Sequence, residues 1–159
     1  MGTSVQVTPL SNVYNESPLC YLLSVDGFNF LMVVSKIDVV LISHSDILHV
    51  GTLSYAMKKL GLSAPVYSMD PVCRLGQLTM YDYYVARRIF DLFTMDDIDF
   101  AFQNITRLRY SQNHHLSDKG EGIVIAPHVT DHLLGGTVWK ITKDGEDFVY
   151  AVDFNHRKE

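Results

Sequence analysis

The feature that most constrains the fold is a strand, helix and strand pattern in the first half of the 159-residue chain. The segment "IDVVLIS", residues 37–43, is apolar and rich in β-branched residues, which indicates a strand buried on both faces. Apolar residues then recur at helical spacing over 50–60, and Gly61 offers the left-handed stop that commonly ends a helix. The segment "APVYSM", 64–69, is a second short strand. This order predicts a parallel βαβ unit with a right-handed crossover, and therefore an α/β fold.

Two Asp-Gly pairs lie between apolar runs, Asp26-Gly27 near the N-terminus and Asp144-Gly145 near the C-terminus. Asp-Gly is a strong hairpin signal because a type I′ turn needs positive φ at both of its central residues. We therefore expect one antiparallel hairpin at each pair.

Two further helices are expected between these hairpins. The first covers 74–90, and its spacing predicts a buried side that carries Leu75, Leu78, Tyr81 or Asp82, and Val85. The second begins at Thr94, because Asp97 follows three residues later and completes a start that resembles a capping box.

Composition restricts the class of partner. The formal net charge is −5, so the chain lacks the broad basic surface that usually binds nucleic-acid phosphates. Its cysteines, Cys20 and Cys73, are too few for a disulfide framework. Ser35-Lys36 and Asp38 break the longest apolar stretch, which predicts no membrane span. We expect a single domain, and if the protein acts on RNA, we expect that contact to be made through protein partners.

Metal-donor side chains follow several of the predicted strands. They are His44, Asp46, His49, His132 and Asp153. Binding sites of α/β folds collect at such junctions between strands and loops. Taken alone, the His-x-Asp-x-x-His spacing favours the ordinary alternative of residues at a helix start, with His49 near the N-cap and His44 bonded to the backbone.

Three segments carry a resemblance to a known family: "ISHSDILHVGTLSYAMKKLGL", "HLLGGTVWKITKDGE" and "YAVDFNHRKE". They resemble the metallo-β-lactamase fold of the RNA-processing nuclease group, and more closely its non-catalytic subunit-two family from the cleavage and polyadenylation specificity factor. The resemblance implies an α/β fold that is a partial αββα sandwich, mainly its N-terminal half. It further implies that residues 1–159 form one partial domain, with the β-CASP insertion and the C-terminal half absent.

The first motif of active members reads His-x-His-x-Asp-His, and this chain departs from it twice. The resemblance aligns His44 with the first histidine and His49 with the last. Asp46 lies where the second histidine is expected, and Leu48 lies where the aspartate is expected. An aspartate can bind zinc but a leucine cannot. A two-metal centre activates its bridging water because two cations share it, so the loss of the carboxylate at Leu48 argues against hydrolysis.

By the same resemblance, His132 matches a later zinc-binding histidine and Asp153 matches the aspartate that bridges two metals. The surviving donors would hold at most one divalent ion; they are His44, Asp46, His132 and Asp153. We therefore expect no catalytic residue, no cofactor and no working metal site, with the five donor positions vestigial.

The resemblance implies a non-catalytic scaffold or interaction element of the pre-mRNA 3′-end cleavage and polyadenylation complex in the nucleus. The expected partners are other subunits of that complex, especially the active metallo-β-lactamase nuclease, with pre-mRNA met indirectly and no membrane. Two alternatives remain. One is a metal-dependent RNA hydrolase that uses the five donors, and the other is a truncated paralogue without a function of its own.

A second departure concerns the connection between the segments 28–34 and 37–43. In the family an Asp-Cys-Gly motif, a loop and a helix lie between the corresponding strands, whereas here the two apolar segments follow each other directly. Parallel neighbours need a crossover of about a dozen residues. Ser35-Lys36 therefore allow only a tight antiparallel hairpin or one continuous strand. The missing motif and helix indicate an internal deletion, so 28–43 is the part least expected to fold as in the family.

Overall fold

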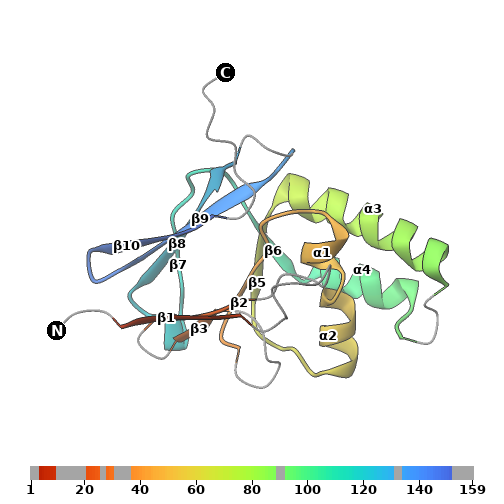
Figure 1. Cartoon of the computed structure of the whole chain (residues 1–159), viewed down its shortest axis with the longest axis horizontal. Coiled ribbons are helices and arrows are strands. Elements are labelled where there is room, and N and C mark those ends of the chain that lie inside the picture. The colour runs from red at the N-terminus through yellow and green to blue at the C-terminus, as the bar shows by residue number, and fades with distance from the viewer. Residues whose placement is uncertain are drawn as a thin grey trace.

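A parallel sheet of three short strands lies in the centre of the molecule (Figure 1). Its order is β4 (Val40–Leu41), β5 (Val66–Met69) and β6 (Ile105–Leu108), and each neighbouring pair is parallel. The parallel pairing of β4 with β5 confirms the predicted βαβ unit. The computed structural model describes residues 4–9, 21–25, 28–30, 37–88, 92–130 and 134–151.

Helices connect these strands and lie together on one side of the sheet (Figure 1). The chain passes from β4 to β5 through α1 (Ile47–Val50) and α2 (Leu53–Lys59). It passes from β5 to β6 through α3 (Asp70–Arg87) and α4 (Met95–Gln103).

The predicted single helix over 50–60 is therefore wrong, because the structure has two helices separated at Gly51-Thr52. Glycine and the β-branched threonine are both weak helix formers, which explains an interruption at this pair. The predicted stop is confirmed, since Gly61 has a φ of +73°.

The buried side predicted for the helix over 74–90 is wrong in part. Leu78 and Val85 of α3 are exposed, whereas Tyr81 packs partly buried against the core. The fully buried residues of α3 are Val72, Cys73, Gly76, Met80 and Tyr84. The reason is close packing. A Cβ atom added to Gly76 would lie 3.2 Å from side-chain atoms of both Phe102 and Val50. A larger side chain would not fit at position 76, where α3 meets α1 and α4, and this contact sets which side of α3 is buried.

The capping box of α4 is confirmed. The Asp97 N–H donates to Thr94 Oγ1 (3.2 Å), and the Thr94 N–H donates to Asp97 Oδ2 (2.8 Å). Lys58 Nζ of α2 lies 3.0 Å from Asp97 Oδ1, so the same carboxylate also links two helices.

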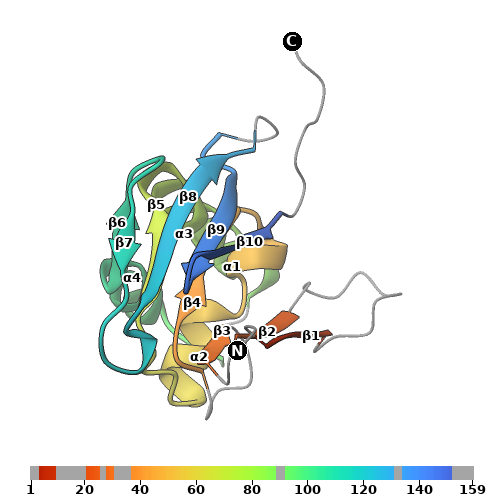
Figure 2. The same cartoon turned by 90° about the vertical axis from the view of Figure 1, so that its left-hand side faces the viewer.

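An antiparallel sheet of four strands packs on the other side of the central sheet (Figures 1 and 2). Its order is β10 (Glu146–Tyr150), β9 (Thr137–Lys143), β8 (Ile123–Val129) and β7 (His114–His115). A short 3₁₀ helix, η1 (Asp118–Gly120), lies between β7 and β8. The hairpin predicted at Asp144-Gly145 is confirmed, and φ is +51° and +82° at its two residues.

A third sheet is formed by β1 (Val5–Pro9), β2 (Tyr21–Val25) and β3 (Phe28–Phe30), all antiparallel. Val25 pairs with Phe28, so the strands of the predicted N-terminal hairpin are confirmed, while Asp26-Gly27 lie outside the described residues.

The central sheet is buried on both faces, as predicted from the segment 37–43. Side chains of β5 enter both cores: Val66 and Met69 join the core beneath the helices, and Tyr67 joins the core against the four-stranded sheet. The second of these, the sheet-side core, consists of Val39, Tyr67, Leu108, Leu116, Ile123, Ile125, Trp139 and Ile141. The layers are therefore helix, sheet and sheet, which confirms the α/β fold class with partial αββα layering.

The short connection between the segments 28–34 and 37–43 falls mostly on residues 31–36. These residues, which include Ser35-Lys36, lie outside the described residues. The strands on either side, β3 and β4, belong to different sheets. The described parts of 28–34 and 37–43 therefore do not pair with each other. No helix within the described ranges is long and apolar enough to cross a membrane.

Candidate functional site

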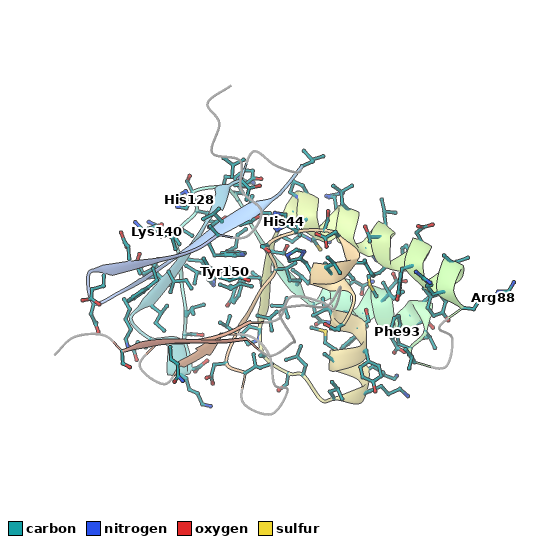
Figure 3. All side chains as sticks on the ribbon, viewed as in Figure 1. His44, Arg88, Phe93, His128, Lys140 and Tyr150 are labelled. Atoms are coloured by element: carbon teal, nitrogen blue, oxygen red, sulfur yellow. The ribbon has the colours of Figure 1, made fainter. Side chains whose placement is uncertain are left out.

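The β4–α1 loop, residues 42–46, lies at the carboxyl end of the central sheet, where α/β folds collect binding sites. Ile42 prolongs the sheet beyond β4, because its N–H donates to a carbonyl of β5 (3.0 Å). The Ser43 carbonyl then accepts a hydrogen bond from the N–H of Thr137 at the start of β9 (2.9 Å). The loop is thus bonded to both sheets, and His44 lies toward the middle of the molecule with only 1% of its surface exposed (Figure 3).

Two histidine rings lie side by side at this loop. The ring centroids of His44 and His49 are 4.9 Å apart, and the ring planes are inclined by 43°. His44 Nδ1 is hydrogen-bonded to Ser43 Oγ at 3.0 Å, and His49 Nδ1 is bonded to Asp46 Oδ2 at 2.7 Å. A neighbouring side chain therefore fixes the Nδ1 atom, and with it the orientation, of each ring.

Asp46 uses both oxygens of its carboxylate. It is the N-cap of α1, where Oδ1 accepts the N–H of Leu48 (3.0 Å) while Oδ2 bonds to His49. Burial acts to raise the pKa of Asp46, but the hydrogen bond and charge of His49 and the Leu48 N–H outweigh it. The pKa of Asp46 is consequently lowered, and the carboxylate stays ionised at neutral pH.

The ionised carboxylate also fixes the proton on His49. A carboxylate can only accept a hydrogen bond, so His49 Nδ1 carries the hydrogen that is shared with Asp46. His49 Nε2 is buried and has no hydrogen-bond partner among the described residues. A carboxylate that orients one ring nitrogen while the other faces inward is also the arrangement found behind metal-bound histidines.

The described residues nevertheless do not fit the two-metal centre of the active motif. No group of three or more His, Cys, Asp or Glu side chains within the described ranges is arranged to hold a metal ion. Asp46 is already engaged through both oxygens, and Leu48 has no donor atom. Of the five predicted positions, the structure brings His44, Asp46 and His49 together. The other two, His132 and Asp153, lie outside the described residues, so their place at the site stays a prediction.

The alternative interpretation, in which these histidines and the aspartate simply begin a helix, is correct in part. A cap does begin α1, but it is Asp46, and His49 lies within the helix. The hydrogen bond that holds the Nδ1 atom of His44 comes from the side chain of Ser43.

Two residues that position the site, Ser43 and Thr137, were not predicted from the sequence. Both are buried. Ser43 is the first polar residue after the apolar strand segment, which is a local signal that can be recognised. Its bond to Thr137 joins residues 94 positions apart, and no pattern in a single sequence indicates such a pairing.

A pocket of about 260 Å³ opens at the other end of the central sheet. It lies beside the start of β4 and β5 and η1, and its lining residues include Val39, Pro65, Tyr67 and Lys119. His44 follows β4 rather than preceding it, so this pocket does not belong to the candidate site.

Comparison with known proteins places the chain in a family. The family described as "Metallo-beta-lactamase superfamily domain" matches residues 24–159. Among solved structures, a metallo hydrolase from the archaeon Ignicoccus hospitalis superposes with a TM-score of 0.59 at 17% identity, covering 96% of this chain and 62% of that chain. The metallo-beta-lactamase fold protein YhfI of Bacillus subtilis gives 0.56 at 18% identity, covering 95% of this chain and 63% of that one. At such low identities these structures establish the fold alone.

Relatives that are similar in sequence define the family more narrowly than the solved structures do. Cleavage and polyadenylation specificity factor subunit 2 of Oryza sativa is 66% identical over 180 positions, and that of Arabidopsis thaliana is 64% identical over 180 positions. The probable subunit 2 of Drosophila melanogaster is 42% identical over 181 positions. Each match covers 100% of this chain but only 24% of the relative, so the chain spans about a quarter of the length of these proteins.

The alignment lengths also bear on the predicted internal deletion. An alignment of 180 positions against a chain of 159 residues leaves at least 21 positions of the rice protein without a counterpart. Internal gaps are therefore confirmed, while their place between 34 and 37 stays a prediction. The resemblance to subunit two is confirmed as well, and the matched family together with the helix, sheet and sheet layers shows that this chain belongs to the metallo-β-lactamase superfamily.

Proposed function

We propose that this chain acts as a non-catalytic scaffold or interaction element of the machinery that cleaves and polyadenylates pre-mRNA 3′ ends. One observation carries the proposal: the chain is 66% identical, over its whole length, to a protein named as subunit 2 of the cleavage and polyadenylation specificity factor. The same name recurs for the relatives from Arabidopsis, Drosophila and Caenorhabditis, which supports a common role.

The chemistry of the β4–α1 loop supports the absence of catalysis. A hydrolytic two-metal centre needs carboxylate and imidazole donors that are free to bind cations. Asp46 is instead occupied by the backbone of Leu48 and by His49, and Leu48 contributes an aliphatic side chain where the active motif has a carboxylate. No step of hydrolysis can be written from these residues alone.

The proposed partners are other subunits of the complex, in particular the active nuclease, and the proposed compartment is the nucleus. The Endoribonuclease ysh1 of Schizosaccharomyces pombe is 26% identical to this chain over 79% of its length, so a nuclease exists among its relatives. The formal charge of −5 favours contact with pre-mRNA through partners rather than directly.

Affinity capture from nuclear extract tests this proposal. The full chain, tagged, should recover cleavage and polyadenylation subunits. A Trp139→Asp variant, which places a charge in the sheet-side core, should recover none of them and serves as the control for folding. Failure of the folded chain to recover any subunit would contradict the assembly role and favour a truncated paralogue without function.

A second assay distinguishes the hydrolase alternative from the non-catalytic proposal. Purified chain incubated with zinc and an RNA that carries a polyadenylation signal should leave the RNA intact. Cleavage that disappears in a His44→Ala variant would establish the enzyme and overturn the non-catalytic proposal.

A further inference from the structure

We propose that Asp46 and His49 form a bridge, made by protein atoms alone, that orders the β4–α1 loop at the place where the active motif binds metal. This inference concerns the internal structure of the chain, so it holds or fails independently of the proposed assembly role.

The first step is the geometry of the bridge. Asp46 Oδ1 accepts the backbone N–H of Leu48 at 3.0 Å, and Asp46 Oδ2 accepts Nδ1–H of His49 at 2.7 Å. The Asp46 carbonyl also accepts the N–H groups of His49 and Val50, both at 3.1 Å. The two carbonyl bonds are those of an ordinary first helical turn. The Asp46 side chain, however, bonds to a backbone donor and to a side-chain ring of α1, whereas an ordinary N-cap side chain satisfies one backbone donor.

The second step is that α1 needs such support. It has only four residues, far fewer than a helix requires to be stable by itself. Leu48 has 42% of its surface exposed, so burial holds α1 only through Val50 and, in part, through Ile47. A charged hydrogen bond across the first turn supplies the remaining constraint. The lowered pKa of Asp46 is consistent with this bond.

The third step follows the contacts away from the helix. The ring of His49 lies against the ring of His44 (centroids 4.9 Å apart), and His44 is hydrogen-bonded to Ser43. The carbonyl of Ser43 accepts the N–H of Thr137. The bridge is thus connected through packed rings to the hydrogen bond that joins the loop to β9. Loss of the bridge should loosen that distant bond, whereas loss of a simple cap would affect α1 only.

Native-state hydrogen exchange of the full chain provides the test, with the Thr137 amide as the reporter and the β8 amides as an internal reference. An Asp46→Ser variant keeps an oxygen that can cap α1, but its side chain is too short to reach His49. It should exchange the Thr137 amide about tenfold faster, the factor expected for loss of one hydrogen bond to a charged group. A His49→Gln variant should accelerate the same amide, and the double variant should add little, because either change removes the same bond.

A second test adds or removes zinc and measures the same amide. Zinc chloride or EDTA added to the wild-type chain should leave exchange at Thr137 unchanged. Three results would overturn the proposal: a Thr137 amide that stays protected in Asp46→Ser, fully additive effects in the double variant, or zinc that slows the exchange at Thr137 in the wild type. If Asp46→Ser does not fold, Asp46→Thr replaces it, because its hydroxyl keeps an oxygen for the cap and its side chain is likewise too short to reach His49.

Discussion

The sheet-side core and the β4–α1 loop lie next to each other but are stabilised in different ways. Around Trp139 the core is apolar, and its members come from β-strands far apart in the chain. In the loop, a few polar atoms from neighbouring residues bond to one another. The hydrophobic effect grows with buried area, so the core dominates stability. The loop contributes less free energy but fixes the position of specific atoms.

The contrast indicates which part of the molecule has kept its role. A core of this kind tolerates the loss of catalysis, because its stability does not depend on a metal. The β4–α1 loop does not rest on such a core, so its own polar contacts must hold it. The bonds of Asp46 to Leu48 and His49 are the contacts available for this purpose in the described residues.

The largest effect is expected from Trp139→Ala. Trp139 is fully buried between its neighbours Pro127 and Tyr150 on adjacent strands. Its truncation should lower the free energy of unfolding by about 3–5 kcal/mol, because the cavity cannot collapse within a paired sheet. Urea unfolding measures this. The control Val149→Ala, at a residue 65% exposed, should stay within about 0.5 kcal/mol of wild type. Equal losses for the two variants would remove the distinction between core and surface.

A smaller effect is expected in the loop itself. Asp46→Ala removes the N-cap and the bond to His49, so the free energy of unfolding should fall by about 1–2 kcal/mol. Asp82→Ala, at an exposed aspartate in the middle of α3, is the matched control and should be nearly neutral. A loss at Asp46 as large as that at Trp139 would show that the loop, and not the core, dominates stability.

The start of α4 offers a comparison by pH, because it too depends on a carboxylate. The hydrogen bond from the Thr94 backbone and the contact with Lys58 lower the pKa of Asp97 from its ordinary value of 3.8. Since the folded pKa is lowered, the stabilisation is complete above the ordinary pKa and is lost as pH falls through the lowered folded value. The difference in unfolding free energy between wild type and Asp97→Asn should therefore shrink as pH is lowered from 6 towards 3. A difference that does not change with pH would contradict this.

The smallest effect is expected at the surface of the hairpin. Lys140 Nζ lies 2.8 Å from Asp147 Oδ2 across β9 and β10, with both side chains substantially exposed. Lys140→Ala should lower the free energy of unfolding only slightly, because solvent screens an exposed ion pair, and added salt should reduce even that effect. Thermal unfolding at low and high salt measures the change. A larger effect that persists in salt would mean that the hairpin depends on this pair.

The sequence predicted those elements whose signals are local. The Asp144-Gly145 turn and the Thr94 and Asp97 cap each depend on a few adjacent residues, and the parallel pairing of β4 and β5 depends on consecutive segments. All three are confirmed. The buried side of α3 was missed because it depends on the close approach of α4 to Gly76, which is a property of the packed structure.

The same distinction between local signals and contacts set by the fold applies to the candidate site. His44, Asp46 and His49 were recognised as a group from their spacing, and the structure brings them together. Spacing could not show that Asp46 bonds to its own helix and to His49, because this depends on where α1 begins. The contact of Ser43 with Thr137 was equally hidden, since it requires two sheets to meet.

The proposed absence of a hydrolytic metal centre in this chain is tested by the metal content of the purified full chain. After incubation with excess zinc and removal of unbound ions, elemental analysis should find less than one zinc ion per chain. An Asp46→His/Leu48→Asp variant, which restores the active motif, should retain more zinc than the wild type. Two tightly bound zinc ions per wild-type chain would contradict the proposed absence of a hydrolytic metal centre.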